Sequence, residues 1–396
     1  MQSYIDLPGA IPFFNRFNIS TGPNVRLSNQ PIYVDFTSGI KLTSYAPPPA
    51  ADRTDGMKRY LEILERYVSV MEPGWWSFPK PKDIPADLLL PLGDLVAKYN
   101  LTAAAPQIFG TNGLGIHDSR SVASMWMMRS VNVDMARTLL GITPGFVPSS
   151  RRNQDLYDAI LRFLGSDVLT STMVVDAERS DKNGIVLKVR NSKTGELTRI
   201  EAKKLLISIS PTEDNLAPFN PDAQERNTLG KFQYTRSYVG VVSHPSLPLN
   251  STLINTPIAA QPTNWLEAIP TAPYTARFDN YANSPYYRII AGGGEDFTEF
   301  DARKLITDSF NRMITTEVIP QTHPPQELKF HLLVGHGKVS ATTSTENVQG
   351  GFIQNLNGLQ GRRSTWFTGS AWSVHISTNL WIFCDTLLPK LVASLK

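Results

Sequence analysis

The sequence predicts a mixed α/β fold, and two observations lead to this prediction. A helical pattern over 153–165 is followed by three strand-like runs at 168–179, 184–190 and 198–210. Near its end the chain has an apolar strand, a glycine and then an apolar helix, in the stretch WFTGSAWSVHISTNLWIFCDTLLPKL. The 396 residues are enough for two domains.

The composition is that of an ordinary globular protein: 41% of the residues are hydrophobic, 18% are charged and the net charge is +3. Lysines and arginines are scattered, so no basic stripe indicates nucleic-acid binding. No apolar run reaches the roughly 18 residues that a membrane span needs. The single cysteine, Cys384, excludes a multi-cysteine metal site, and the six histidines, among them His117, lack metal-ligand spacing. We therefore expect no nucleic-acid partner, no membrane and no metal.

The first part of the chain begins with strands and continues with helices. PIYVDF (31–36) and GIKLTSY (39–45) have the pattern of two strands around a short turn. The proline-rich stretch 46–55 is predicted to be a linker, and apolar residues at helical spacing predict a helix over 56–71. The following residues are α-rich, with GDLVAKY and SVASMWMMRSVNVDMARTLL as the clearest helices.

The later elements carry stronger boundary signals. Asn153 is a candidate N-cap for the 153–165 helix, and the turns SDKNG and NSKTG separate the three strands that follow. Thr298 and Asp301 have capping-box spacing, which predicts a helix in TEFDARKLITDSFNRMI. KFHLLVGH (329–336) is predicted to be one more strand.

Two motifs of other protein classes can be set aside. LLVGHGKVS contains G-x-G-x-x-S after an apolar strand, but the dinucleotide fingerprint needs a helix that opens at the glycines. The residues that follow, ATTSTENVQGG, are too β-branched and glycine-rich for that helix, and we predict a loop. The sequence has no G-x-S-x-G nucleophile elbow of a hydrolase.

The last helix begins near Ser377, and its first turn presents unpaired N–H groups and a partial positive charge. Such an end stabilises an electron-rich or anionic group. Taken alone, the simpler interpretation is that Ser377 or Thr378 caps a helix on the surface.

Together, the mid-chain and terminal segments resemble the flavin-dependent amine-oxidase superfamily, and within it the fungal FAD oxidoreductases related to β-cyclopiazonate dehydrogenase. NQDLYDAILRFLGSDVLTSTMVVDAERSDKNGIVLKVRNSKTGELTRIEAKKLLISISP is similar to the family's second FAD-contacting segment, and GGFIQNLNGLQGRRSTWFTGSAWSVHISTNLW is similar to its closing FAD motif. The resemblance implies an incomplete FAD/NAD(P)-binding Rossmann-like domain with an α+β substrate domain of the amine-oxidase type. It implies non-covalently bound FAD as the cofactor.

The resemblance assigns cofactor-binding positions to Val174, Gly369, Ser370, Trp372 and Ser377. Val174 is the position for the adenine contact. Ser370 stands where many relatives have an acidic residue, so one polar contact to the cofactor is expected to differ.

If the register of the mid-chain strand slips by one residue, Met173 takes the place of Val174. Many relatives also place a lysine over flavin N5. The alignment puts Arg236 there, with Lys231 nearby and Tyr234 as a second catalytic candidate. An arginine stays protonated and cannot act as a base, although it can order water or oxygen.

The resemblance implies transfer of hydride from a small organic or secondary-metabolite substrate to the flavin, and then of electrons to oxygen or another acceptor. It also implies a discontinuous domain organisation. We expect 1–45, 151–215 and 338–396 to form the remnant of the FAD-binding domain, and 46–150 and 216–337 to form the substrate domain.

The family's opening G-x-G-x-x-G unit does not occur in these residues. We therefore expect a truncated form with impaired FAD binding, or a pseudo-enzyme. The alternative from another class is a cofactor-free binding or interaction protein that keeps the flavoprotein shell. The sequence leaves the location of the protein open: secreted if a lost N-terminus carried a signal peptide, and otherwise cytoplasmic.

Overall fold

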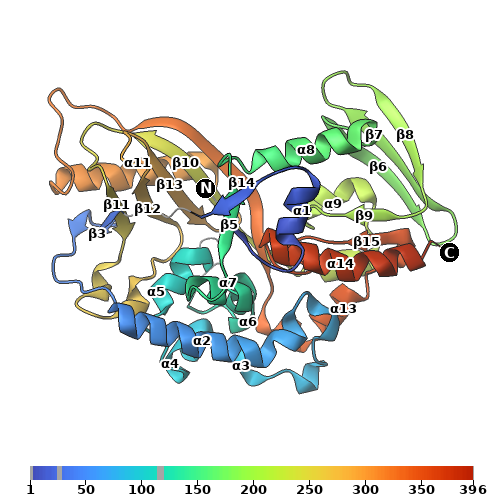
Figure 1. Ribbon diagram of the computed structural model, residues 1–396, viewed down its shortest axis with the longest axis horizontal. Helices are drawn as coiled ribbons and strands as arrows, with labels where there is room; N and C mark the ends of the chain where they lie inside the picture. Colours follow the sequence, from blue (N-terminus) through green and yellow to red (C-terminus); the bar gives the residue numbers. More distant parts are fainter. Residues whose placement is uncertain (1–2, 25–28, 114–119, 396) are drawn as a thin grey trace.

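The computed structural model of the protein describes residues 3–24, 29–113 and 120–395, so His117 lies outside the described residues. Three parts meet in the middle of the molecule (Figure 1). One is a seven-stranded sheet, the second is a group of helices from α2 (Ala50–Met71) to α7 (Val133–Leu139), and the third contains two small sheets and α14 (Ser377–Ala393). This arrangement confirms the predicted mixed α/β fold class.

The seven-stranded sheet has the order β14-β10-β13-β12-β11-β3-β4. Its strands are β3 (Gln30–Asp35), β4 (Ile40–Lys41), β10 (Gln233–Ser243), β11 (Ser251–Asn255), β12 (Tyr274–Asn280), β13 (Tyr287–Gly293) and β14 (Lys329–Thr342). Strand β3 is parallel to β11, and the other neighbours are antiparallel. Helix α11 (Glu299–Thr315) packs on this sheet through a buried apolar cluster that includes Phe278, Ile289 and Phe310.

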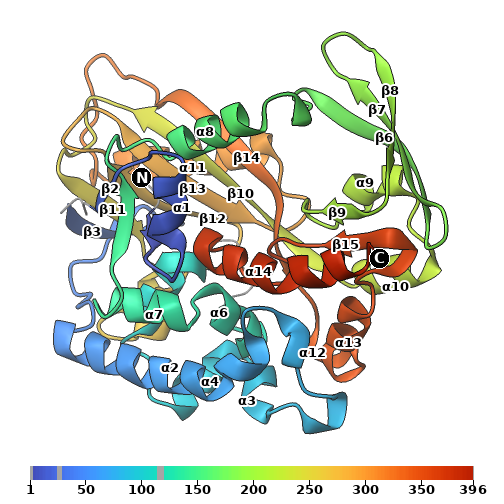
Figure 2. The same cartoon turned by 45° about the vertical axis from the view of Figure 1, so that its right-hand side comes forward.

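The third part begins with α8 (Gln154–Leu164) and the antiparallel sheet β6 (Thr172–Ser180), β7 (Gly184–Asn191) and β8 (Leu197–Ala202). Strand β9 (Leu205–Ile207) then pairs in parallel with β15 (Thr365–Phe367), the strand before α14. The predicted helix, hairpin and closing strand–helix unit are all present. The turned view in Figure 2 shows α14 in front of β15 and β9, with α8 above them.

Shorter elements fill the space between these parts. Strands β1 (Tyr4–Ile5), β5 (Gly145–Pro148) and β2 (Thr21–Pro23) form a small antiparallel sheet. The remaining α-helices are α1 (Ala10–Arg16), α3 (Ala86–Leu89), α4 (Leu92–Lys98), α5 (Ala105–Ile108), α6 (Ser124–Ser130), α9 (Glu213–Leu216), α10 (Ala223–Leu229), α12 (Thr345–Gln349) and α13 (Phe352–Asn357).

Three local expectations need correction. Helix α2 begins at Ala50, inside the predicted linker, because Pro49 fits the position before a first turn and alanines favour the helix. The single pattern over 121–140 is two helices, α6 and α7. They are separate because the side chain of Asn132 accepts a hydrogen bond from the Met135 amide (3.0 Å) and caps α7.

The third correction concerns ATTSTENVQGG (341–351), which was predicted to be a loop. Its first two residues end the long strand β14, which also contains GHGKVS, and Thr345–Gln349 form helix α12. Gly335 lies against the ring of Tyr238, and an added Cβ would come within 2.8 Å of that ring. The absence of a side chain at Gly335 is therefore explained by packing. Helix α12 begins at Thr345, ten residues after this glycine, so no helix opens at the glycines of this motif.

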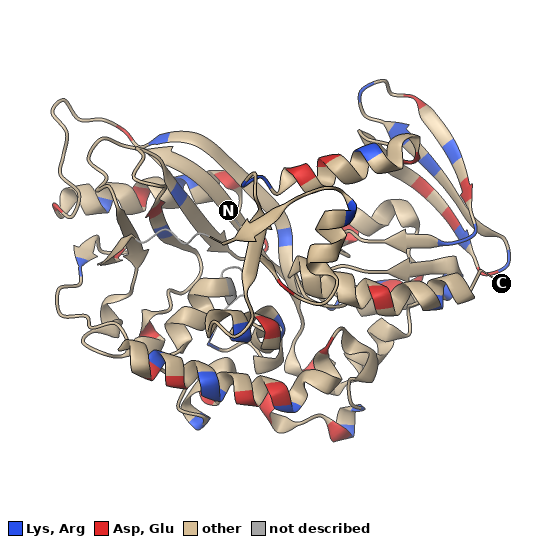
Figure 3. Ribbon diagram, viewed as in Figure 1, with Lys and Arg blue, Asp and Glu red and all other residues tan. Residues whose placement is uncertain are grey.

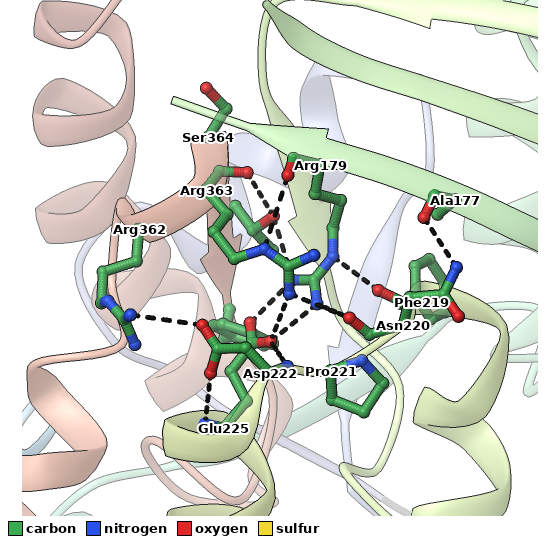
Figure 4. Close-up of polar contacts among 12 residues, drawn as sticks. Ala177, Arg179, Phe219, Asn220, Pro221, Asp222, Glu225, Arg362, Arg363 and Ser364 are labelled. Atoms are coloured by element: carbon green, nitrogen blue, oxygen red, sulfur yellow. Dashed lines mark hydrogen bonds and ion pairs between the residues drawn. The ribbon is translucent and has the colours of Figure 1, made fainter. Parts of the chain in front are cut away.

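A buried ion pair fastens β6 to α10. The guanidinium of Arg179 donates to both carboxylate oxygens of Glu225 at 2.7 Å, and these side chains are only 1% and 3% exposed. Arg363 donates to the same carboxylate at 3.0 Å, and the Arg179 Nε donates to the carbonyl of Phe219 at 2.7 Å (Figure 4). Because Arg363 lies just before β15, this network fixes the hairpin sheet against the closing strand.

We expect Glu225→Gln to destabilise the fold strongly, because it leaves a buried guanidinium without its counter-charge. The expected loss is about 3–5 kcal/mol, measured as the free energy of unfolding in urea. The matched control is Glu201→Gln, which breaks the Arg199–Glu201 pair, whose side chains are 65% and 63% exposed. That control should lower the free energy of unfolding by about 1 kcal/mol or less. Equal losses in the two variants would contradict the assigned role of the network.

Candidate active site

A cavity of about 930 Å³ lies where the three parts of the molecule meet. We call it the first cavity. Its walls come from β1, from α7 and the turn after it, from the start of α8, from β12 and from the start of α14. The volume is at the upper end of the usual range for small-molecule sites.

The N-terminus of α14 opens into the first cavity. Ser377 and Thr378 line it, and the N-cap residue Ile376 has no side chain that can cap the helix. Thr378 is only 2% exposed, and its hydroxyl has no hydrogen-bond partner among the described residues. The interpretation as a capped surface helix is therefore wrong. A buried, uncapped helix end with an unpartnered hydroxyl fits an electron-rich ligand group.

The charge of the first cavity also suits an electron-rich group. Arg277 and His375 are among its lining residues, whereas the described lining residues include no carboxylate. The His375 side chain has protein on most sides but is solvent-accessible at the cavity wall. Partial desolvation there, and then the nearby Arg129, lower the pKa of His375 to about 4. The imidazole is therefore neutral at neutral pH.

The segment between β15 and α14 is held by the helical part of the molecule. The guanidinium of Arg129 donates to the Ser370 carbonyl (3.3 Å), and the indole of Trp75 donates to the Ala371 carbonyl (3.3 Å). Trp372 stacks on Phe367, with ring centroids 4.9 Å apart. These contacts aim the first turn of α14 at the cavity.

Gly369 makes the turn out of β15. Its φ of +108° is unfavourable for residues with a side chain, and an added Cβ would lie 3.4 Å from the Ser208 carbonyl. Of the predicted cofactor residues Gly369, Ser370, Trp372 and Ser377, the structure places Ser377 on the first cavity and the other three in the segment that leads to it.

The other predicted residues lie elsewhere. Val174 is half-buried in β6, pairs with Val189 and packs on the main core, and its neighbour Met173 is 58% exposed. Arg236 and Tyr234 lie on β10. The Arg236 Nε donates to the Glu295 carbonyl (2.7 Å), and Tyr234 lines a separate cavity of about 590 Å³. Neither residue lines the first cavity.

Sequence reasoning missed Arg277, His375 and Arg129. His375 lies inside the quoted terminal segment, two residues before the helix, so its position was a usable signal. Arg129 and Arg277 come from distant parts of the chain, and no local pattern in the sequence marks them.

A carboxyl pair supports α14 from the side. Asp134 accepts a hydrogen bond from the side-chain amide of Asn379 at 2.6 Å. Glu72 lies beside Asp134, and burial, followed by repulsion from Asp134, raises the pKa of Glu72 to about 7. Glu72 therefore holds its proton in the folded protein at pH values where the unfolded chain has lost it.

Comparison with solved structures defines the class of fold. A fatty acid isomerase from P. acnes superposes with a TM-score of 0.68 at 13% identity, over 98% of this chain and 86% of the isomerase chain. A putrescine oxidase variant gives a TM-score of 0.58 at 11% identity, over 99% and 90% of the two chains. The fold is therefore of the flavin amine-oxidase type.

Sequence relatives define the family. A β-cyclopiazonate dehydrogenase of Aspergillus flavus is 30% identical over 363 residues, which cover 91% of this chain and 75% of the relative. The FAD-dependent oxidoreductase pigF of Monascus ruber is 27% identical, over 97% and 78% of the two chains. The chain belongs to the fungal FAD-dependent oxidoreductases related to β-cyclopiazonate dehydrogenase. It is an oxidoreductase with FAD as its cofactor, as the resemblance implied.

No protein-family model matches the chain. Among the helices that the structure describes, none combines the length and the apolar character needed to cross a bilayer. Lysines and arginines alternate with acidic residues over much of the ribbon, for example along α2 (Figure 3).

We expect Glu72→Gln to change the pH dependence of stability. The pKa of Glu72 rises from 4.5 to about 7 on folding, so wild-type stability falls as the pH rises through this window. Glutamine does not titrate, so the stability of the variant does not fall for this reason as the pH rises. Its advantage over the wild type should therefore grow between pH 5 and pH 8, by up to about 3 kcal/mol.

The measurement is urea unfolding of both proteins across that pH range. His375 titrates in part of the same window, but it is present in both proteins and cancels in the difference. The control is Glu62→Gln, at an exposed site on α2, the helix that ends just before Glu72. Its free energy of unfolding should change with pH in the same way as that of the wild type. If Glu72→Gln also runs parallel, the carboxyl of Glu72 does not hold its proton on folding.

Proposed function

We propose that the first cavity holds the isoalloxazine ring of FAD, with the electron-rich N1–C2=O edge at the N-terminus of α14. The observation that carries this proposal is the uncapped, buried start of α14, where Thr378 has a hydroxyl without a partner among the described residues. The mid-chain and terminal segments that the sequence singled out lie in the part of the molecule that forms this helix and its neighbouring strand.

The proposed reaction is oxidation of a small organic substrate, of the secondary-metabolite kind, by hydride transfer. Bound FAD supplies the hydride acceptor. The first turn of α14 stabilises negative charge at the ring, and neutral His375 adds a hydrogen-bonding group without a charge.

We carry the other predicted site residues forward as proposals. Val174 is proposed for the adenine contact, and Gly369, Ser370 and Trp372 for the segment that shapes the flavin side. Tyr234 and Arg236 stay catalytic candidates. They are supported by their shared position near Glu295, where the Tyr234 hydroxyl has no hydrogen-bond partner among the described residues.

We also propose the domain division drawn from the sequence. In it, 1–45, 151–215 and 338–396 serve the cofactor, and 46–150 and 216–337 serve the substrate. The parallel pairing of β9 with β15 supports joining the second and third cofactor segments. Strands β3 and β4, from the first segment, are hydrogen-bonded into the seven-stranded sheet of the substrate unit.

Thr378→Val tests the ring site. Valine keeps the shape of threonine and removes the hydroxyl, so we expect FAD and riboflavin to bind about threefold to tenfold more weakly, the worth of one hydrogen bond. Stability without flavin should stay equal or rise, because an unpartnered buried hydroxyl is removed. Quenching of flavin fluorescence measures the binding, and thermal unfolding measures the stability.

The matched control is Thr386→Val, the same change two turns further along α14. The Thr386 hydroxyl contacts Trp76 and Phe383, away from the cavity. This control should leave flavin affinity unchanged. Unchanged affinity in Thr378→Val, together with a loss of stability, would show that Thr378 is a structural residue and would reject the ring site.

We further propose that these 396 residues bind whole FAD weakly. Support comes from large apolar side chains that are exposed on the cofactor side, including Leu206 and Ile209 near β9 and Leu388 and Val392 on α14. Each such side chain forgoes roughly 1.5–3 kcal/mol of burial. The purified chain should carry much less than one flavin per molecule. A stoichiometric flavin absorbance spectrum after purification would refute the proposal.

A further inference from the structure

Arg277 stands between two cavities. It lines the first cavity and also a second cavity of about 350 Å³, which we define by Tyr33, Tyr45, Arg53, Phe109 and Arg277. A residue shared by both spaces is in contact with whatever extends from one into the other.

The backbone turns Arg277 toward these spaces. Between β12 and β13 the register shifts, with Thr275 opposite Ala291 and Arg277 opposite Ile290, so Ala276 is an extra residue. Such a β-bulge changes the direction of the following side chain, and bulges are frequent next to functional sites. The next residue, Phe278, points to the other face and enters the core under α11.

The single carboxylate beside Arg277, that of Asp279, does not neutralise all of the positive charge around it. Its Nε lies 3.0 Å from Oδ2 of Asp279, and Arg288 approaches the same oxygen at 2.5 Å. Two guanidinium groups thus share one carboxylate. Burial, offset in part by Asp279, lowers the pKa of Arg277. Although its Nε is in ionic contact with Asp279, this buried nitrogen makes no hydrogen bond of good geometry among the described residues.

The second cavity has apolar walls and a positive character. Tyr33 packs edge-on against Tyr45, with centroids 4.8 Å apart, and Phe109 and several prolines complete the walls. Arg53 on α2 is a second cation in the lining, and the described lining residues include no carboxylate. This chemistry suits a flat or hydrophobic body that carries a negative charge.

We propose that the substrate of this oxidoreductase carries an anionic group on a largely apolar body, and that Arg277 binds the anionic group between the two cavities. The inference rests on the proposed function, because the first cavity is taken as the flavin site. The body of the substrate fills the aromatic second cavity. The carbon to be oxidised then lies on the side of Arg277 that faces the first cavity.

The test uses 2-naphthoate and 2-naphthamide as probes, which share a shape and differ in charge. Their binding to the 396-residue chain is measured by calorimetry, with and without added FAD. We expect the wild type to prefer the acid by about tenfold to one hundredfold, as a hydrogen bond to a charged group provides. Arg277→Gln should lose this preference, and both probes should then bind equally.

Arg288→Gln is the matched control. It removes a charge from the same Asp279, but Arg288 lines neither cavity and is 48% exposed. This variant should keep the preference for the acid. Arg277→Lys should keep a reduced preference, because the ammonium retains the charge without the planar fork. Arg277→Lys also keeps the test informative if circular dichroism shows that Arg277→Gln does not fold.

Equal binding of the two probes to the wild type, or a preference that survives Arg277→Gln, would overturn the inference. Loss of the preference in Arg288→Gln as well would also overturn it, because the effect would then be diffuse charge. The two proposals fail separately. If flavin does not bind but the acid preference depends on Arg277, the ring site is rejected and the anion site stands. If flavin binds and no acid preference exists, the anion site is rejected and the ring site stands.

Discussion

One guanidinium joins the three parts of this molecule. Arg129 on α6 donates to the Ala341 carbonyl in β14 (2.8 Å) and to the Ser370 carbonyl before α14 (3.3 Å). It packs over the ring of Trp126 at 4.8 Å. The helical part, the seven-stranded sheet and the segment that aims α14 therefore meet at a single buried cation. The position of the α14 terminus relative to β12, and with it the shape of the first cavity, depends on this interaction.

The same cation shapes the chemistry of the cavity. Desolvation, and then the charge of Arg129, lower the pKa of His375, so the imidazole stays neutral. Arg277, another lining residue, supplies positive charge, and the helix end adds a partial charge. The cavity is thus positive without an acidic residue among its described lining. Such a field favours electron-rich groups, whether they belong to a cofactor or to a substrate.

The elements with local signals were predictable from the sequence. The β6–β8 hairpins follow from strand patterns and turn residues, and α11 follows from its capping box at Thr298 and Asp301. The start of α14 near Ser377 was predicted from the change from a polar stretch to an apolar helical segment. Arg129 and Arg277 were not predictable, because a lone arginine in a helix or strand has no distinctive pattern. Their roles arise from contacts between segments more than 200 residues apart, and from a β-bulge that only strand pairing reveals.

Because local signals are predictable and distant contacts are not, the cofactor class can be inferred from the sequence, whereas the substrate class must be inferred from the structure. The proposed flavin ring site uses backbone N–H groups at a helix start, and local sequence fixes where a helix starts. Recognition of the substrate instead depends on which side chains reach the second cavity. Tyr33 and Tyr45 come from the first strands, Phe109 from the helical part and Arg277 from β12. On the proposed arrangement, α14 and its cofactor can stay the same while substrates change through single residues on these other elements, and we propose Arg277 as such a residue in this chain.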